Sequence, residues 1–333
     1  MAMGGLGPPP LIVRRALRLV WPVLAAITTL ACLPLLVVGA IWSLADRRAR
    51  LFRATGLVLL GVWLDVQLLV GCWRLWLADP RGQSPTWRRD HEELLVRVLD
   101  TAMRLGRKWV GLDVRLDTVM DFGDPQRPLI AFARHAGPAD SLAVAWLLSR
   151  TAGRLPRIVL ADALRWDPGI DLILTRLGSA FVPSASGAGD DRISGVRRLA
   201  DTLDPRDALL IFPEGENWTP ARRRRLIDRL RQAGHHARAR QAELLRNVLP
   251  PKTKGAIATL TARPDADVMI VAHAGLGELA GPRAIFDAIP FQQPFLVHTW
   301  TYLADQVPRD PAAIEAWLTA RWSEIDAWVE GHE

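Results

Sequence analysis

The chain has 333 residues, of which 42 are Lys or Arg, and its formal net charge is +7. This length allows one large domain with an appendage or two domains, and the charge favours polyanionic partners such as lipid headgroups, phosphorylated substrates or nucleic acid. The two cysteines, Cys32 and Cys72, both lie in apolar segments, so the sequence supports neither a disulfide framework nor a cysteine metal site.

Two apolar segments occupy the N-terminus. Residues 19–44 carry no charge, and residues 54–77 form a second apolar run that only Asp65 and Arg74 interrupt. Both runs are long enough to cross a bilayer, and the first is too long for the apolar region of a cleaved signal peptide. Pro34 leaves open whether the first segment spans the membrane or turns back within it. We expect residues 1–78 to form a membrane-associated helix pair in the cell membrane, with the rest of the chain on the cytoplasmic face.

A polar linker and an amphipathic helix are expected over residues 79–127. Apolar residues from Leu94 to Trp109 recur at helical spacing, with Arg97, Arg104 and Arg107 between them. This pattern indicates a helix that lies on a membrane surface or packs against the following domain.

Residues 128–333 alternate between apolar strands and helical segments. Strands are predicted at 128–133, 157–160, 179–182, 208–212 and 268–272, and helices at 139–151, 168–177, 191–203, from 219 onward, and 253–262. Such alternation predicts an α/β domain, with a mixed, mostly parallel sheet flanked by helices.

Two strand ends carry side chains suited to chemistry. His135 and Asp140 follow the first predicted strand, and Pro213, Glu214 and Gly215 follow the strand that ends at Phe212. Residues just beyond the carboxyl ends of strands are where ligands bind in open α/β sheets. A His-x4-Asp spacing arises readily by chance, so the pairing of the two junctions carries the argument.

These motifs resemble those of the glycerolipid acyltransferases of the lysophosphatidic acid acyltransferase type, whose members carry His-x4-Asp followed by Phe-Pro-Glu-Gly. Residues 245–260 and 308–328 are similar to segments of the lysocardiolipin acyltransferase-like branch. The resemblance implies a membrane-bound O-acyltransferase that moves a fatty acyl group from acyl-CoA or acyl carrier protein to a lysophospholipid, by default 1-acylglycerol-3-phosphate. It implies no metal and no cofactor besides the acyl donor. Another lysolipid or a glycolipid as acceptor, a hydrolase, and an inactive membrane scaffold are the alternatives.

The residue types fit this reaction. Histidine has a reference pKa of about 6.5, which suits a general base near neutral pH, so we expect His135 to activate the acceptor hydroxyl. An aspartate on the other ring nitrogen fixes the tautomer, which is the expected role of Asp140. Pro213, Glu214 and Gly215 are expected to bind substrate: Gly215 by allowing close approach to the backbone, and Glu214 by binding a hydroxyl or by holding the loop.

The sequence departs from the family pattern after Gly215. Glu216 and Asn217 stand where relatives commonly have Thr-Arg, so we expect Arg222, Arg223 or Arg134 to hold the acceptor's phosphate. Near the start of the family's second motif, where relatives have a lysine, this chain has Ala161.

A strongly basic stretch follows at 219–241. It is either a solvated face or a surface for anionic membrane lipid or coenzyme A phosphates. Nucleic acid is not expected as a partner, because no recognition motif accompanies the charge.

His235 and His236 point to different helix faces and do not form a metal site, and His273 is expected to be a core residue rather than part of a pocket.

Overall fold

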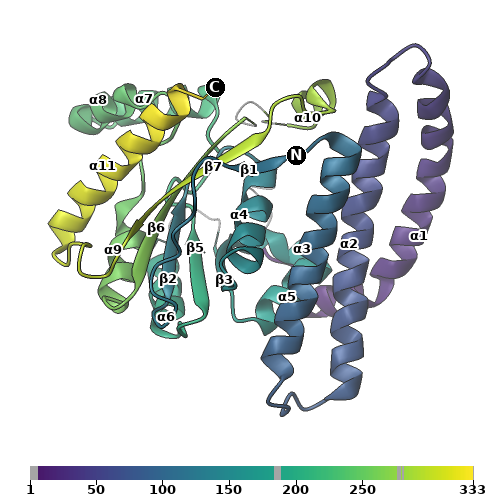
Figure 1. The fold of residues 1–333 in the computed structure, drawn as a ribbon, viewed down its shortest axis with the longest axis horizontal. Coiled ribbons are helices and arrows are strands. Elements are labelled where there is room, and N and C mark those ends of the chain that lie inside the picture. The colour runs from purple at the N-terminus through teal and green to yellow at the C-terminus, as the bar shows by residue number, and fades with distance from the viewer. Residues whose placement is uncertain (1–6, 184–188, 276–278, 280, 333) are drawn as a thin grey trace.

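The computed structural model describes residues 7–183, 189–275, 279 and 281–332, in which a helical hairpin leads into an α/β domain (Figure 1). The strands are β1 (Val114–Leu116), β2 (Leu129–Ala133), β3 (Leu155–Ala161), β4 (Ala180–Val182), β5 (Asp207–Ile211), β6 (Asp267–Ala274) and β7 (Phe295–Tyr302). The helices before β4 are α1 (Leu11–Trp42), α2 (Arg50–Ala78), α3 (Trp87–Val110), α4 (Pro138–Arg150), the short 3-10 helix Asp162–Trp166, and α5 (Pro168–Arg176). Those after β4 are α6 (Gly189–Asp201), α7 (Pro220–Gln232), α8 (His236–Leu244), α9 (Thr253–Ala262), α10 (Pro282–Ala288) and α11 (Pro311–Glu330).

The seven strands form one sheet in the order β1-β7-β6-β2-β5-β3-β4. All neighbouring strands are parallel except β6 and β7, which are antiparallel. The sheet is therefore mixed and mostly parallel, as the alternation of strands and helices predicted. The central strands β2, β5 and β6 are buried along their whole length, which explains their continuous apolar sequences.

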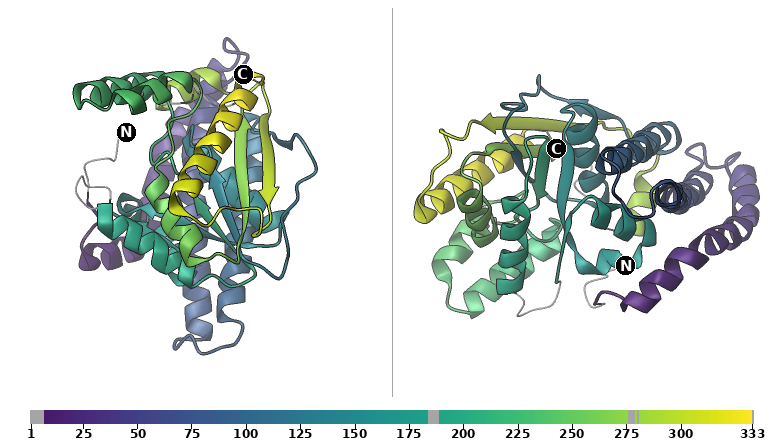
Figure 2. Two further views of the ribbon diagram at one scale, coloured as in Figure 1. Left: turned by 90° about the vertical axis from the view of Figure 1, so that its left-hand side faces the viewer. Right: turned by 90° about the horizontal axis from the view of Figure 1, so that it is seen from below.

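Helices cover both faces of the sheet, and each strand sends alternate side chains into two separate cores. On one face, Ile130 and Phe132 pack with residues of α6, α9 and α11. On the other, Leu129 and Ala131 pack with residues of α2, α3, α4 and α5. The two views in Figure 2 show these layers, with α7 and α8 lying apart at one end of the molecule.

The N-terminal hairpin is bound tightly to the α/β domain. Buried residues of α2 belong to the same apolar core as α3, α4 and α5. The buried Asp65 of α2 accepts a hydrogen bond from the backbone N–H of Gly169 at 2.8 Å. Arg14 and Arg18 of α1 both donate to the buried carboxylate of Asp171 in α5, with Nη2 of each at 2.6 and 2.7 Å from a carboxylate oxygen.

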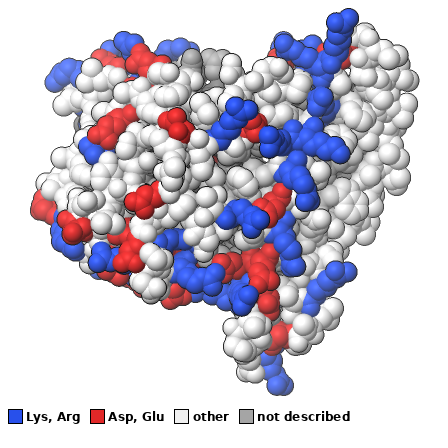
Figure 3. All heavy atoms as spheres, viewed as in Figure 1, with Lys and Arg blue, Asp and Glu red and all other residues white. Residues whose placement is uncertain are grey.

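By length and composition, α1 and α2 are long and apolar enough to cross a membrane. Only 11% of the most apolar window of α1 is buried, against 33% for α2, so α1 is not a core helix of the α/β domain. Helix α1 continues through Pro34 without a break, and the chain reverses only after Trp42. The outer surface of this hairpin is almost free of charged side chains (Figure 3).

Three elements differ from the sequence expectation. The sheet begins before residue 128, because β1 lies inside the expected linker and pairs with β7. Strand β7 itself was not predicted. The basic stretch after residue 219 forms two helices rather than one, because Gly234, at a φ of 75°, ends α7 and starts a turn into α8.

Candidate active site

His135 and Asp140 lie together at the carboxyl end of β2. The ring Nδ1 of His135 is 3.0 Å from Oδ2 of Asp140. A carboxylate only accepts hydrogen bonds, so Nδ1 carries the proton and Nε2 keeps its lone pair. The side chain of His135 is 21% exposed, whereas that of Asp140 is 1% exposed. The geometry therefore presents a histidine with a free basic nitrogen and a buried partner that fixes its tautomer.

The carboxylate of Asp140 is surrounded by donors. Oδ2 also accepts from the backbone N–H groups of Ala136 and Gly137, at 2.7 and 2.9 Å, and Oδ1 accepts from that of Ser141. Burial raises the pKa of Asp140, but hydrogen bonds from His135 and His273 outweigh burial and leave the pKa well below its usual value. Asp140 thus stays ionised while it closes the first turn of α4 and orients His135.

Glu214 connects the two motifs. Its side chain is buried, with Oε1 accepting from the backbone N–H of His135 at 2.9 Å and Oε2 from that of Leu249 at 2.8 Å. Burial raises the pKa of Glu214 to about 7. Because each carboxylate oxygen already accepts a backbone hydrogen bond, the structure favours the loop-holding role over direct contact with a substrate hydroxyl. The backbone N–H of Trp218 donates to the carbonyl of His135 at 2.6 Å, so the loop after β5 holds His135 at both its amide and its carbonyl.

His273 is a member of this cluster that sequence reasoning placed in the core instead. It is buried at the end of β6, where Nε2 lies 3.0 Å from the carbonyl of Arg134 and 3.6 Å from Oδ2 of Asp140. Burial lowers the pKa of His273, so the ring is neutral with its proton on the nitrogen that faces Arg134. Only the pairing of β2 with β6 brings it here, and the sequence contains no signal of that pairing.

Two of the arginines expected to hold a phosphate are engaged elsewhere. Arg134 is fully buried, and its guanidinium donates to the backbone carbonyls of Asn247 and His273. Arg223 donates to the carbonyls of Glu243 and Leu245 at the end of α8. Arg134 is therefore not placed to bind a phosphate, because its charge faces the protein interior. Arg223 connects α7 to the end of α8.

Arg222, Pro213 and Gly215 lie around the loop after β5. Arg222 donates to the carbonyl of Asn217 at 2.9 Å and lies 3.6 Å from the carboxylate of Glu216, with a third of its side chain exposed. Pro213 is buried, and its carbonyl accepts from the backbone N–H of Lys252. Gly215 is exposed and has a φ of 72°, which an L side chain rarely adopts.

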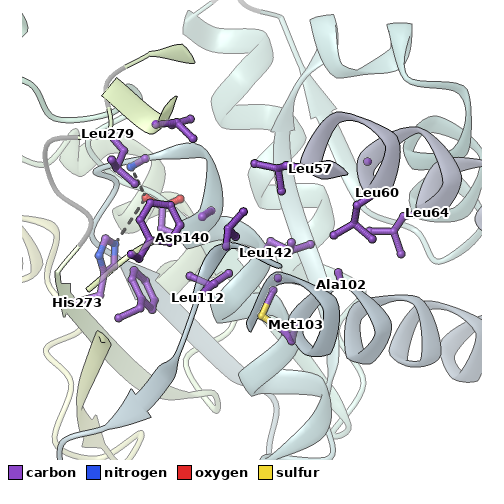
Figure 4. A pocket seen from close by; sticks show the side chains of 18 residues that line it. Leu57, Leu60, Leu64, Ala102, Met103, Leu112, Asp140, Leu142, His273 and Leu279 are labelled. Atoms are coloured by element: carbon purple, nitrogen blue, oxygen red, sulfur yellow. Dashed lines mark hydrogen bonds and ion pairs between the residues drawn. The ribbon is translucent and has the colours of Figure 1, made fainter. Parts of the chain in front are cut away.

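A cavity of about 250 Å³ opens beside Asp140 and His273. Apart from these two, its lining is almost wholly apolar and includes Leu57 and Leu64 of α2 and Met103 of α3. Figure 4 shows the two polar side chains at one end of the cavity and the leucines of α2 at the other. The cavity therefore runs from Asp140 and His273 toward the N-terminal hairpin and can hold an apolar chain. Within the described residues, no group of three or more His, Cys, Asp or Glu side chains could hold a metal ion.

Comparison with known proteins identifies the family of this domain. The structure is similar to the crystal structure of the 1-acyl-sn-glycerophosphate (LPA) acyltransferase PlsC from Thermotoga maritima, with a TM-score of 0.49 and 13% identity, over 83% of this chain and 98% of that chain. No curated protein sequence matches the chain. Residues 115–273 match the family model described as Acyltransferase, and this segment contains both motifs. The lysocardiolipin acyltransferase-like branch stays a prediction, and the resemblance to the acyltransferase family is confirmed over residues 115–273.

Proposed function

We propose that the protein transfers a fatty acyl group from an acyl thioester, on coenzyme A or acyl carrier protein, to the hydroxyl of a lysophospholipid, with 1-acylglycerol-3-phosphate as the default acceptor. The observation that carries this proposal is that Asp140, which binds the ring of His135, lines the polar end of an otherwise apolar cavity. An acyl chain in the cavity would bring its thioester carbonyl to the histidine.

The reaction needs no nucleophile from the protein. Nε2 of His135 takes the proton of the acceptor hydroxyl as its oxygen attacks the thioester carbonyl carbon. Asp140 stabilises the imidazolium that forms. When the carbon–sulfur bond breaks, the imidazolium returns the proton to the thiolate, which leaves as a free thiol. The backbone N–H groups of Ala136 and Gly137 already donate to Asp140, so other donors must stabilise the oxyanion.

We further propose that α1 and α2 attach the enzyme to the cell membrane, with the α/β domain on the cytoplasmic face. Large apolar side chains lie exposed along α1, including Leu19, Leu30 and Ile41. Burial of this surface in lipid removes apolar side chains from water and requires no charged group to leave water with them. The full-length protein is expected to float with phosphatidylglycerol vesicles in both low and high salt, and release by high salt would contradict apolar insertion.

An acyl-transfer assay tests the proposed activity directly. Purified full-length protein is given palmitoyl-CoA or palmitoyl-acyl carrier protein together with lysophosphatidic acid, lysophosphatidylglycerol or lysocardiolipin, and the diacyl products are measured by mass spectrometry. Formation of phosphatidic acid supports the default acceptor, and another diacyl product assigns a different lysolipid. Release of free palmitate without a diacyl product would indicate a hydrolase. No turnover of any thioester would favour a scaffold and sink the proposal.

A further inference from the structure

The loop after β5 contains no arginine in the two positions after Gly215, and all three expected substitutes donate to backbone carbonyls. A phosphate-bearing substrate at this loop therefore needs another cation. Lys252 meets this need from a separate segment of the chain. Its backbone N–H donates to the carbonyl of Pro213 at 2.8 Å, which places the lysine directly beside the Pro-Glu-Gly sequence.

The side chain of Lys252 passes across Gly215. A Cβ atom added to Gly215 would lie 3.2 Å from Cδ of Lys252, 3.1 Å from Cε, and closer still to Nζ. The left-handed backbone at Gly215 and the absence of a side chain there leave room for the lysine stem. Glu214, the neighbour of Gly215, holds the backbone of His135. The ammonium group of Lys252 therefore lies against the same loop that holds His135.

Within the described part of the chain, the ammonium group has no bonded counter-ion. Among the residues that the structure describes, none accepts a hydrogen bond from Nζ or forms an ion pair with it within 4 Å. Desolvation by the surrounding protein lowers the pKa of Lys252, the field of Glu216 opposes this shift, and Arg192 and Arg229 add to it. Lys252 is nevertheless exposed to solvent. An accessible, partly desolvated cation with no bonded partner is favourable for a phosphate, which supplies a negative charge.

Neighbouring groups extend the same charge pattern. Arg222, Arg225 and Arg229 of α7 line a groove together with Glu216. Glu216 lies near Arg222, at 3.6 Å, and its field also reaches Lys252. Glu216 therefore supplies negative charge near both Arg222 and Lys252.

We propose that Lys252 is a phosphate-binding residue, held across Gly215 so that its ammonium group positions a phosphate of one of the two substrates beside the His135 loop. The proposal rests on the proposed acyl transfer. The phosphate belongs either to the lysophospholipid acceptor or to the coenzyme A of the donor, and both present the same phosphate oxygens to an ammonium group.

Three variants of the full-length protein test this role. Lys252→Met removes the charge and keeps the length of the stem, and Lys252→Arg restores a positive charge. Lys254→Met is the matched control, because Lys254 is an exposed lysine two residues away for which the structure shows no hydrogen bond or ion pair. Kinetics compare lysophosphatidic acid with monoacylglycerol, and palmitoyl-CoA with palmitoyl-pantetheine. Each pair differs in its phosphate groups. Titration calorimetry with lysophosphatidic acid and with coenzyme A measures binding without turnover.

Lys252→Met is expected to raise the KM and Kd of one phosphate-bearing substrate by at least about 10-fold, since a hydrogen bond to a charged group contributes about 1.5–3 kcal/mol. The kcat should change by less than about 3-fold, because the lost contact is equal in ground and transition states. Lys252→Arg should retain most of the binding. Lys252→Met should leave the KM of the phosphate-free substrate unchanged, and Lys254→Met should leave all of these constants unchanged. An effect on lysophosphatidic acid assigns the phosphate to the acceptor, and an effect on coenzyme A assigns it to the donor.

The proposal is overturned if Lys252→Met weakens neither ligand, or if it weakens the phosphate-free substrate equally. An equal loss in Lys254→Met would also overturn it, because the effect would then belong to general surface charge. If the wild-type protein transfers no acyl group, the proposed function fails, whereas the calorimetric contrast still decides the role of Lys252.

Discussion

The loop after β2 and the loop after β5 lie next to each other at the carboxyl edge of the sheet, but they use their polar side chains differently. The first loop exposes His135 and buries the carboxylate that orients it. The second buries Glu214 against the first loop and exposes Glu216 to the cations of α7. We therefore expect a division of roles, in which the first loop performs the chemistry, and the second loop holds the first in place and faces the charged part of a substrate.

The largest expected effect comes from the exposed side chain of the first loop. His135→Ala should reduce kcat by at least about 10²-fold, the lower end of the contribution of a positioned general base, while the fold and vesicle binding remain. Steady-state kinetics and circular dichroism measure both. His236→Ala is the control, since His236 is exposed at the start of α8. Near wild-type turnover in His135→Ala would remove this histidine from the mechanism.

Asp140→Asn should be nearly as severe, with kcat reduced by about 10²-fold. The amide nitrogen of Asn would face backbone N–H groups whose hydrogen bonds the carboxylate now accepts. The wrong imidazole tautomer of His135 would also become accessible. Asp305→Asn, at an exposed position, should leave kcat unchanged. The two variants are compared at matched folded concentration, determined by thermal unfolding. Equal kcat values for Asp140→Asn and wild type would show that Asp140 only caps α4.

Glu214→Gln should act through the fold rather than through the chemistry. One carboxylate oxygen would be replaced by an amide donor that faces a backbone N–H, so the free energy of unfolding should fall by about 1–3 kcal/mol. Turnover per folded molecule should fall less than in the two variants of the first loop. Urea unfolding of Glu214→Gln and of Glu315→Gln, an exposed control, measures this difference.

The pH dependence provides a second test of Glu214. Burial raises its pKa to about 7 in the folded protein, above its ordinary value of 4.5. Between these values the folded state binds a proton that the unfolded state has lost, so the contribution of this carboxyl to stability is present below pH 4.5 and is lost as the pH rises through 7. Wild-type stability should therefore fall from pH 5 to pH 8 relative to Glu214→Gln. Parallel pH profiles would mean that Glu214 is ionised throughout.

The smallest expected effect concerns the exposed carboxylate of the second loop. Glu216→Gln removes an anion that competes with a phosphate for Lys252 and Arg222, so the KM of the phosphate-bearing substrate should fall by about 2–5-fold at low salt. Because the site is exposed, the difference should disappear at about 0.5 M salt. Kinetics at two ionic strengths measure it. An increase in KM would mean that Glu216 itself binds substrate.

Local sequence patterns predicted the five strands from β2 to β6 and the proximity of His135 to Asp140, but not β1 or β7. The apolar runs of β2, β5 and β6 mark central strands because strands buried on both faces lack alternation. His135 and Asp140 are only five residues apart, so a single turn and the start of a helix bring them together. The short strand β1 and the split between α7 and α8 leave much weaker local signals.

Tertiary structure alone decided which of the cations near the motifs are buried and which are exposed. Arg134, Arg223 and Lys252 are all cations near the motifs in sequence or space, and nothing in their local sequence distinguishes a buried backbone-binding guanidinium from an exposed ammonium group. That distinction depends on strand order, which places Arg134 next to His273 at the end of β6, and on the return of the chain at Lys252 to Pro213. Contacts between residues distant in sequence are set by packing of the whole domain, whereas helices, strands and short turns follow from neighbouring residues.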